Sequence, residues 1–403
     1  MVNDLNKERY SKFALPLGKI KVPKYLYIFL IVLIILILII SGFYFYLKNN
    51  PKKTTTNKSV IKNEGIINKT DGLVDKSNSD LLEKMSKDLI LWLEKQRDDR
   101  GVYSENEICE NGVCNGNIQS NRSGFSVLSG EVRYEKKINQ HIIDDLKKYS
   151  DKDKVQVIQS NYLLCNFLYD IYNYPNASEE AKNLTEKICF DSQYEIFNDD
   201  YNSIYVQDIN TEEILNQNLS KLERIVDDKE KVSSVASDNF NILNKYGYYA
   251  SEFATRYKWK NKEEDYKGFL VSVNKFLDLY GNKSSQFADG EVCSFAWGLA
   301  DIGEYKNLLK LRDYGRVIYK DEVSDDKIAK MTLKQALTCG LAANRFNDKD
   351  ALDKLITKTI SAFYNKEKGC IGQQSIESLT NIYDVKNNGI FLFLLNSKTF
   401  KNE

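Results

Sequence analysis

The most suggestive pair of chemical groups in this sequence is Asp289-Gly-Glu291. Two neighbouring carboxyl groups can act as proton donor and proton acceptor when they lie roughly 5 to 10 Å apart across a glycosidic bond. The pair also directly precedes a predicted helix over about 292–309, where a carboxylate is favoured simply as a cap. Capping is the default interpretation, and Asp289 and Glu291 are the first choice for acid and base if the protein is an enzyme.

Histidine chemistry is limited because the 403 residues contain one histidine, His141. Zinc sites with three histidines are excluded, and a Ser-His-Asp or Cys-His arrangement would have to use this residue. We expect His141 on an exposed helix edge. A zinc site from Cys109, Cys114 and His141 is an alternative, but the spacing of the two cysteines is unusual for zinc and a disulfide competes. No metal and no cofactor are therefore predicted.

The seven cysteines are scattered, which argues for disulfides or buried thiols. Asn111-Gly112 favours a turn between the first two, and the next two lie on either side of the turn at 174–175. An odd number leaves one cysteine unpaired. The predicted pairs are Cys109–Cys114, Cys165–Cys189 and Cys339–Cys370, with Cys293 buried and free. In the competing interpretation all seven are reduced.

Residues 25–47 form an uncharged run of 23 residues, with tyrosines near both ends. As a helix, this run would measure roughly 34 Å, enough to cross a bilayer. A cleaved signal peptide is the alternative, but the run is too long and is preceded by too many residues. The sequence therefore predicts a single-pass anchor that contacts the lipid bilayer through 25–47.

The anchor divides the chain into a basic cytoplasmic tail (1–24), the transmembrane helix (25–47), a polar tether (48–80) and a large domain (81–403). Basic residues flank the anchor almost equally, so the orientation rests on the rule that a large domain after an N-terminal anchor is usually exported. We expect a cell-membrane location with an extracytoplasmic large domain. Equal numbers of basic and acidic residues, 57 each, argue against a nucleic-acid partner.

Only one proline, Pro175, follows the tether, and apolar residues recur at helical spacing throughout the large domain. The sequence therefore predicts an all-α domain of helical hairpins. A weak repeat aligns Ala250, Ala296 and Ala342 at intervals of 46 residues. Small residues there would let neighbouring helices approach closely, so we expect these helices to form an inner layer and their partners an outer one.

The segment from Trp92-Leu-Glu-Lys-Gln96 to Gly101-Val-Tyr103 resembles one repeat of the α/α-toroid superfamily, which includes six-hairpin glycosidases, polysaccharide lyases and terpene cyclases. An open HEAT-like solenoid is the alternative fold. The toroid resemblance implies that loops from outer to inner helices meet at one end and form a cleft. Besides the acid and base, that cleft would contain Tyr103, Glu105, Asp199, Asp200, Tyr201, Gln373 and Gln374.

Two functions fit these expectations. The first is a membrane-anchored protein that presents its helical domain outside the cytoplasm in a surface binding or scaffold role. The alternative is a membrane-tethered carbohydrate-active enzyme, a glycoside hydrolase or polysaccharide lyase, as the toroid resemblance implies. The corresponding partners are a surface protein or a glycan.

Overall fold

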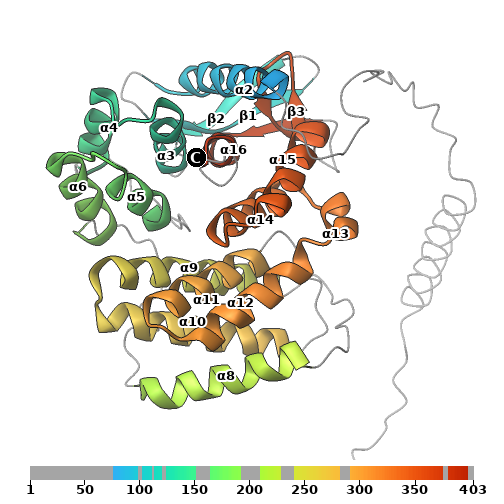
Figure 1. The fold of residues 1–403 in the computed structure, drawn as a ribbon. Helices are drawn as coiled ribbons and strands as arrows, with labels where there is room; N and C mark the ends of the chain where they lie inside the picture. The colour runs from blue at the N-terminus through green and yellow to red at the C-terminus, as the bar shows by residue number, and fades with distance from the viewer. Residues whose placement is uncertain are drawn as a thin grey trace, which may run out of the picture. The chain divides into compact units, whose positions relative to one another are not determined.

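The computed structural model describes nine stretches of the chain: 76–98, 102–110, 113–119, 124–150, 164–191, 209–227, 240–281, 291–374 and 380–397. The chain divides into two units, 1–73 and 74–403, and every described residue belongs to the second. The described residues are mostly helical, so the all-α prediction is confirmed at that level (Figure 1).

The described helices are joined in some places by two to four residues and in others by longer segments. In chain order they are α2 (Lys76–Lys95), α3 (Gly124–Glu135), α4 (Gln140–Ser150), α5 (Leu164–Tyr172), α6 (Glu179–Glu186), the π-helical turn η2 (Lys187–Asp191), α8 (Thr211–Asp227), α9 (Phe240–Lys260), α10 (Glu263–Gly281), α11 (Glu291–Tyr305), α12 (Leu309–Glu322), α13 (Asp325–Lys330), α14 (Leu333–Arg345), α15 (Lys349–Phe363) and α16 (Val385–Leu395). Helix α2 begins at Lys76, so the last five residues of the predicted tether are helical.

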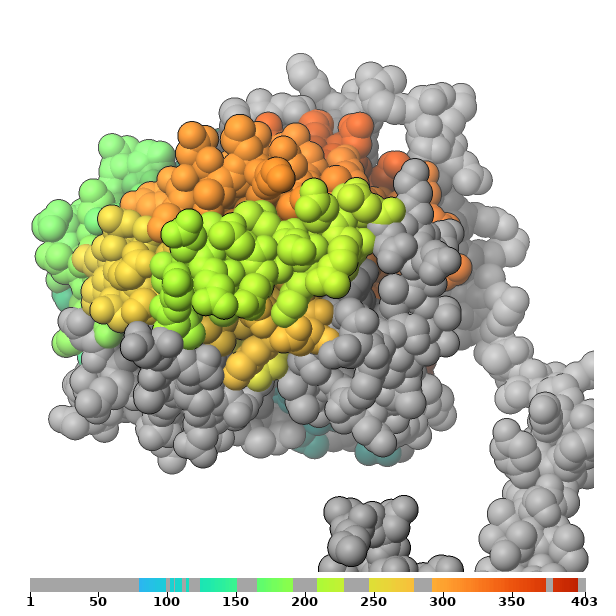
Figure 2. Space-filling view, turned by 90° about the horizontal axis from the view of Figure 1, so that it is seen from below, coloured from blue at the N-terminus to red at the C-terminus, as the bar shows by residue number. Residues whose placement is uncertain are grey.

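Six of these helices contact one another in series. The contacts run from α3 to α5, α9, α11, α14 and α16, and α16 in turn contacts α3. We call these six helices the inner series. The other helices cover it: α10 packs on α9, α12 on α11 and α15 on α14, while α8 lies on the surface over α10 and α12 (Figure 2). The predicted alternation of inner and outer helices is therefore present in the described residues.

Small residues let members of the inner series pack closely. Ala250, Ala296 and Ala342 are fully buried on α9, α11 and α14, as the repeat predicts. A Cβ atom on Gly298 of α11 would come within 2.9 Å of the backbone at Ala250. Backbones this close leave no space for a side chain, so the contact requires glycine.

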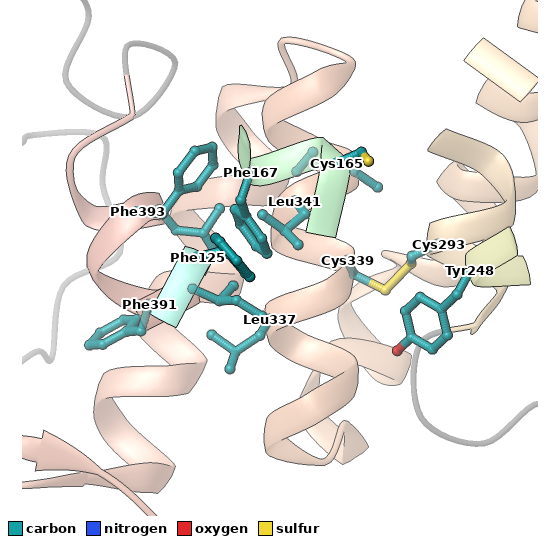
Figure 3. Packing of buried hydrophobic residues seen from close by; sticks show 14 of the residues in the cluster. Phe125, Cys165, Phe167, Tyr248, Cys293, Leu337, Cys339, Leu341, Phe391 and Phe393 are labelled. Atoms are coloured by element: carbon teal, nitrogen blue, oxygen red, sulfur yellow. A yellow bond between two sulfur atoms is a disulfide. The ribbon is translucent and has the colours of Figure 1, made fainter. Parts of the chain in front are cut away.

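Large apolar side chains fill the space between the inner helices. Phe125 of α3, Phe167 of α5 and Phe393 of α16 lie close together, with Leu337 and Leu341 of α14 beside them (Figure 3). The rings of Phe167 and Phe393 meet edge to face, with centroids 5.8 Å apart. These side chains are at most 5% exposed, so they form part of one continuous hydrophobic core.

A small antiparallel sheet, which the sequence did not indicate, joins segments from the two ends of this unit. Its strand order is β2 (Val113–Gln119), β1 (Ser104–Glu110), β6 (Asn381–Asp384) and β5 (Gln373–Gln374). Glu107 of β1 lies opposite Tyr383 of β6. A second hairpin, β3 (Tyr364–Asn365) and β4 (Cys370–Ile371), follows α15. The sheet therefore places the segment before α3 beside the segment before α16.

The predicted membrane anchor requires correction. Among the residues that the structure describes, no helix combines the length and the apolarity needed to cross a bilayer. Both versions of the predicted function included a single-pass anchor, which no described helix supports. The run on which it was predicted, 25–47, lies outside the described residues.

Candidate functional site

The predicted cleft residues fall into three groups. Tyr103, which is buried, lies beside β1, and Gln373 and Gln374 are exposed on β5 of the same sheet. Glu105 lies in β1 and Glu291 begins α11, but neither side chain is among those described. The remaining four lie outside the described residues: Asp199, Asp200, Tyr201 and Asp289. The proposed acid and base therefore stay predictions.

The described residues include three disulfides, two of which were predicted. Cys109–Cys114 and Cys165–Cys189 are confirmed. The predicted Cys339–Cys370 pair is wrong, because Cys339 bonds to Cys293 and Cys370 is the free, buried thiol. Cys293 and Cys339 occupy equivalent positions of the 46-residue repeat, which places them on neighbouring helices of the inner series. The interpretation with seven reduced cysteines is also wrong.

One of the three described disulfides is more exposed to solvent than the other two. Both sulfur-bearing residues of Cys165–Cys189 and of Cys293–Cys339 are at most 1% exposed. In the remaining pair, Cys109 is 7% exposed, whereas Cys114 is at least partly exposed to solvent. Thiol–disulfide exchange requires access to a sulfur atom, so Cys109–Cys114 is the described disulfide best placed to react.

Strand pairing and strand alternation position this disulfide within the sheet. Cys109 and Cys114 lie directly opposite each other on the antiparallel strands β1 and β2, with their Cα atoms 4.0 Å apart. The strand alternation puts Glu107 on the same face of β1 as Cys109. The disulfide therefore has a carboxylate beside it on the sheet.

Lys368 supplies a positive charge to the same face. Its Nζ atom donates to Oε2 of Glu107 at 2.8 Å and lies 3.1 Å from Sγ of Cys114. The ammonium also lies 4.9 Å from the centre of the Tyr383 ring, a cation–π contact. The indole Nε1 of Trp92 donates to Glu107 at 3.4 Å. We call Glu107, Cys109, Cys114 and Lys368 the sulfur–lysine cluster.

The turn between β3 and β4 holds Lys368 in this place. The side-chain oxygen of Asn365 accepts from the backbone N–H groups of Glu367 and Lys368. Gly369 has a φ of 72°, and a Cβ atom there would come within 2.9 Å of Asp88 on α2. Only glycine combines that backbone conformation with that approach, so the turn packs closely against α2.

The arrangement suits a redox-active cysteine pair. An ammonium next to an exposed sulfur favours the thiolate, which is the nucleophile in thiol chemistry. Cys114 is the more accessible member, and Cys109, directly opposite it on the neighbouring strand, is placed to resolve a mixed disulfide. The carboxylate of Glu107 offsets part of the positive charge and holds the ammonium in place.

The structure separates the residues of the alternative zinc site. His141 lies on α4, is half-exposed, and its Nε2 atom lies 3.3 Å from Oε2 of Glu131 on α3. This interaction raises the pKa of His141. In the part of the chain that the structure describes, the group with metal-ligand atoms within 4.8 Å of one another is Glu107, Cys109 and Cys114. His141 is not among them.

A second unusual carboxyl group lies inside the helical domain. Glu252 of α9 is 1% exposed, and its Oε1 atom accepts from the backbone N–H of Cys165, in the first turn of α5, at 2.9 Å. Its Oε2 atom is buried without a hydrogen-bond partner among the described residues. Burial raises the pKa of Glu252 to about 7. The sequence signal was an isolated acid within the otherwise uncharged stretch 246–255.

Comparison with protein-family profiles, curated proteins and solved structures finds no match to this chain.

Proposed function

We propose that this protein is an α/α toroid that performs thiol–disulfide exchange through Cys109 and Cys114 in an oxidising compartment. The contact between α3 and α16 supports the toroid, because an open solenoid would keep the first and last helices of the inner series apart. The connections into α3 and into α16, which carry β1, β2, β5 and β6, pair in one sheet. They would lie at the end of the toroid where loops from outer to inner helices meet.

Three disulfides among the described residues support an oxidising compartment, because cytosolic thiols are kept reduced. Two of these bonds are buried and join neighbouring parts of the helical domain. The third is exposed, and the Nζ atom of Lys368 lies 3.1 Å from its accessible sulfur. This contact is the observation that carries the proposed exchange activity.

The exchange proceeds in two steps. The Cys114 thiolate attacks a substrate disulfide, so that a bond forms between Sγ and one substrate sulfur while the other leaves as a thiolate. The Cys109 thiolate then attacks Sγ of Cys114, which re-forms the protein disulfide and releases the second substrate thiolate. The substrate gains two electrons and the cysteine pair loses two. The reverse sequence oxidises a dithiol substrate.

A direct test uses the full chain and glutathione. A dilute dithiol should reduce Cys109–Cys114 and leave both buried disulfides intact, as peptide mapping after alkylation would show. After removal of the dithiol, the reduced protein should convert glutathione disulfide to glutathione with re-formation of Cys109–Cys114. In Cys109→Ser, Cys114 should instead retain one glutathione. The proposal fails if the buried disulfides are reduced first, or if Cys114 acquires no glutathione.

A further inference from the structure

The sulfur–lysine cluster brings together three groups that are metal ligands in other chemical contexts. One carboxylate oxygen of Glu107 and the sulfurs of Cys109 and Cys114 all lie within 4.8 Å of one another. A thiolate binds zinc at about 2.3 Å and a carboxylate oxygen at about 2.0 to 2.2 Å. Ligand atoms at these distances from one ion are separated by less than 5 Å, so the three groups can reach a shared ion once the bond between the sulfurs is broken and the sulfurs move apart.

The ammonium of Lys368 shows that this position accepts a cation. Its Nζ atom is held at the same time by the Glu107 carboxylate, at 2.8 Å, and by Sγ of Cys114, at 3.1 Å. In the oxidised protein the two sulfurs share a bond and carry no charge, so one ammonium balances the one carboxylate. Reduction would add up to two negative charges at the same point, where one ammonium no longer balances the group.

We propose that reduction of Cys109–Cys114 creates a zinc site formed by Glu107 and the two cysteine thiolates, with Lys368 displaced. This inference rests on the proposed function, because it requires that the disulfide be reducible in the folded protein. A dithiol reductant supplies two electrons and becomes a disulfide. Zn²⁺ then replaces the thiol protons, and the flexible side chain of Lys368 moves away.

The ligand set favours zinc over the common hard cations. Thiolates bind Zn²⁺ strongly, whereas Mg²⁺ and Ca²⁺ prefer oxygen ligands alone. Three protein ligands leave a fourth position of a tetrahedral ion for water or another ligand. Formation of the disulfide would remove two of the three protein ligands and release the ion, so the cluster would bind zinc only when reduced.

Zinc titration of the full chain tests the inference. The protein is prepared oxidised and after mild reduction, and bound zinc is measured by elemental analysis after gel filtration. One zinc per chain is expected in the reduced protein and none in the oxidised protein. Bound zinc should also protect Cys109 and Cys114 from alkylation and change the fluorescence of Trp92, whose indole contacts Glu107.

Variants inside and outside the sulfur–lysine cluster distinguish zinc binding at this site from adventitious zinc binding. Cys114→Ser and Glu107→Gln should each weaken binding at least about tenfold, whereas His141→Gln and Cys370→Ser should leave it unchanged. Lys368→Gln should tighten binding, because the competing ammonium is gone, although the same variant slows the proposed exchange. Because Lys368→Gln should raise the zinc affinity and lower the exchange rate, this one substitution distinguishes zinc binding from exchange.

Two results would overturn the inference in distinguishable ways. If thiols appear at Cys109 and Cys114 but no zinc binds, or if Cys114→Ser binds zinc as well as the parent does, the zinc site is wrong and the exchange activity stands. If mild reduction produces no thiols at these positions, the exchange activity fails, and the zinc site fails with it.

Discussion

Cys293 of α11 and Cys339 of α14 are separated by 46 residues and are joined by a disulfide. Their separation equals the interval that relates Ala250, Ala296 and Ala342, so the bond links equivalent positions of two successive repeats. The bond therefore holds these equivalent positions of α11 and α14 next to each other. The bond also joins two helices that are otherwise held by side-chain packing.

Loss of this disulfide should destabilise the protein more than loss of the exposed one. Chain-entropy arguments give about 4 kcal/mol for a loop of 46 residues and about 2 kcal/mol for one of 5. The double variant with Cys293→Ser and Cys339→Ser should therefore unfold at lower denaturant concentration than the one with Cys109→Ser and Cys114→Ser. The reverse order in equilibrium unfolding would show that the inner-series disulfide is not a main structural bond.

The free thiol of Cys370 should be inert in the folded protein. Burial raises its pKa to about 12, and its side chain is fully buried. A thiol reagent at pH 8 should therefore find no reactive group in the oxidised native chain and one per chain after unfolding without reductant. Rapid modification of one thiol in the native protein would contradict the assigned pairing or the burial of Cys370.

Glu252 should make stability depend on pH in an unusual direction. Its carboxyl titrates near 4.5 in the unfolded chain, and burial raises its pKa to about 7 in the folded protein, despite the nearby Arg256 and Lys386. Between these values the folded state binds more protons, so the free energy of unfolding decreases as pH rises from about 4.5 to 7. Asp265, also nearby, acts in the same direction as burial.

Glu252→Gln should remove this component, because glutamine is neutral at every pH. We expect the variant to be more stable than the parent at pH 8, by up to roughly 3 kcal/mol, and similar at pH 4. Glu264→Gln, at an exposed position of α10, is the control and should leave the pH profile unchanged. A parallel profile for Glu252→Gln and the parent would show that Glu252 does not titrate in this range.

The close contact between α9 and α11 can be tested by adding one methyl group. Gly298→Ala places Cβ 2.9 Å from the backbone at Ala250, which cannot move without shifting a helix, so we expect a loss of about 1 to 3 kcal/mol. Gly340→Ala on α14 is the matched control, because its nearest neighbour is the end of the Leu394 side chain, which can rotate. Equal stability of the two variants in denaturant unfolding would contradict the inner-series packing.

Features that depend on nearby residues could be predicted from the sequence. Helical periodicity and the lack of proline indicated the helices, and Cys109–Cys114 and Cys165–Cys189 follow from separations of 5 and 24 residues around recognisable turns. The repeat also indicated buried small residues on α9, α11 and α14. Each of these features is set by local geometry or by one helix face.

Features that depend on distant contacts could not be predicted. The Cys339–Cys370 assignment failed because it considered one hairpin, whereas the actual partner lies on a neighbouring helix of the inner series. The contact between Lys368 and Cys114 spans 254 residues and depends on how β1 pairs with β6. No local pattern specifies that pairing, so the sulfur–lysine cluster was missed although its cysteines were noted.

If Lys368 activates Cys114, the rate at which Cys114 reacts with glutathione disulfide should depend on the folded structure and on this lysine. In the Cys109→Ser protein at pH 7, Cys114 should react with glutathione disulfide about tenfold faster when folded than when unfolded, because the ammonium favours the thiolate. Lys368→Gln should remove most of this advantage, whereas Lys366→Gln, exposed in the same turn, should not. Equal rates in the folded and unfolded protein, with no effect of Lys368→Gln, would show that Lys368 does not activate Cys114.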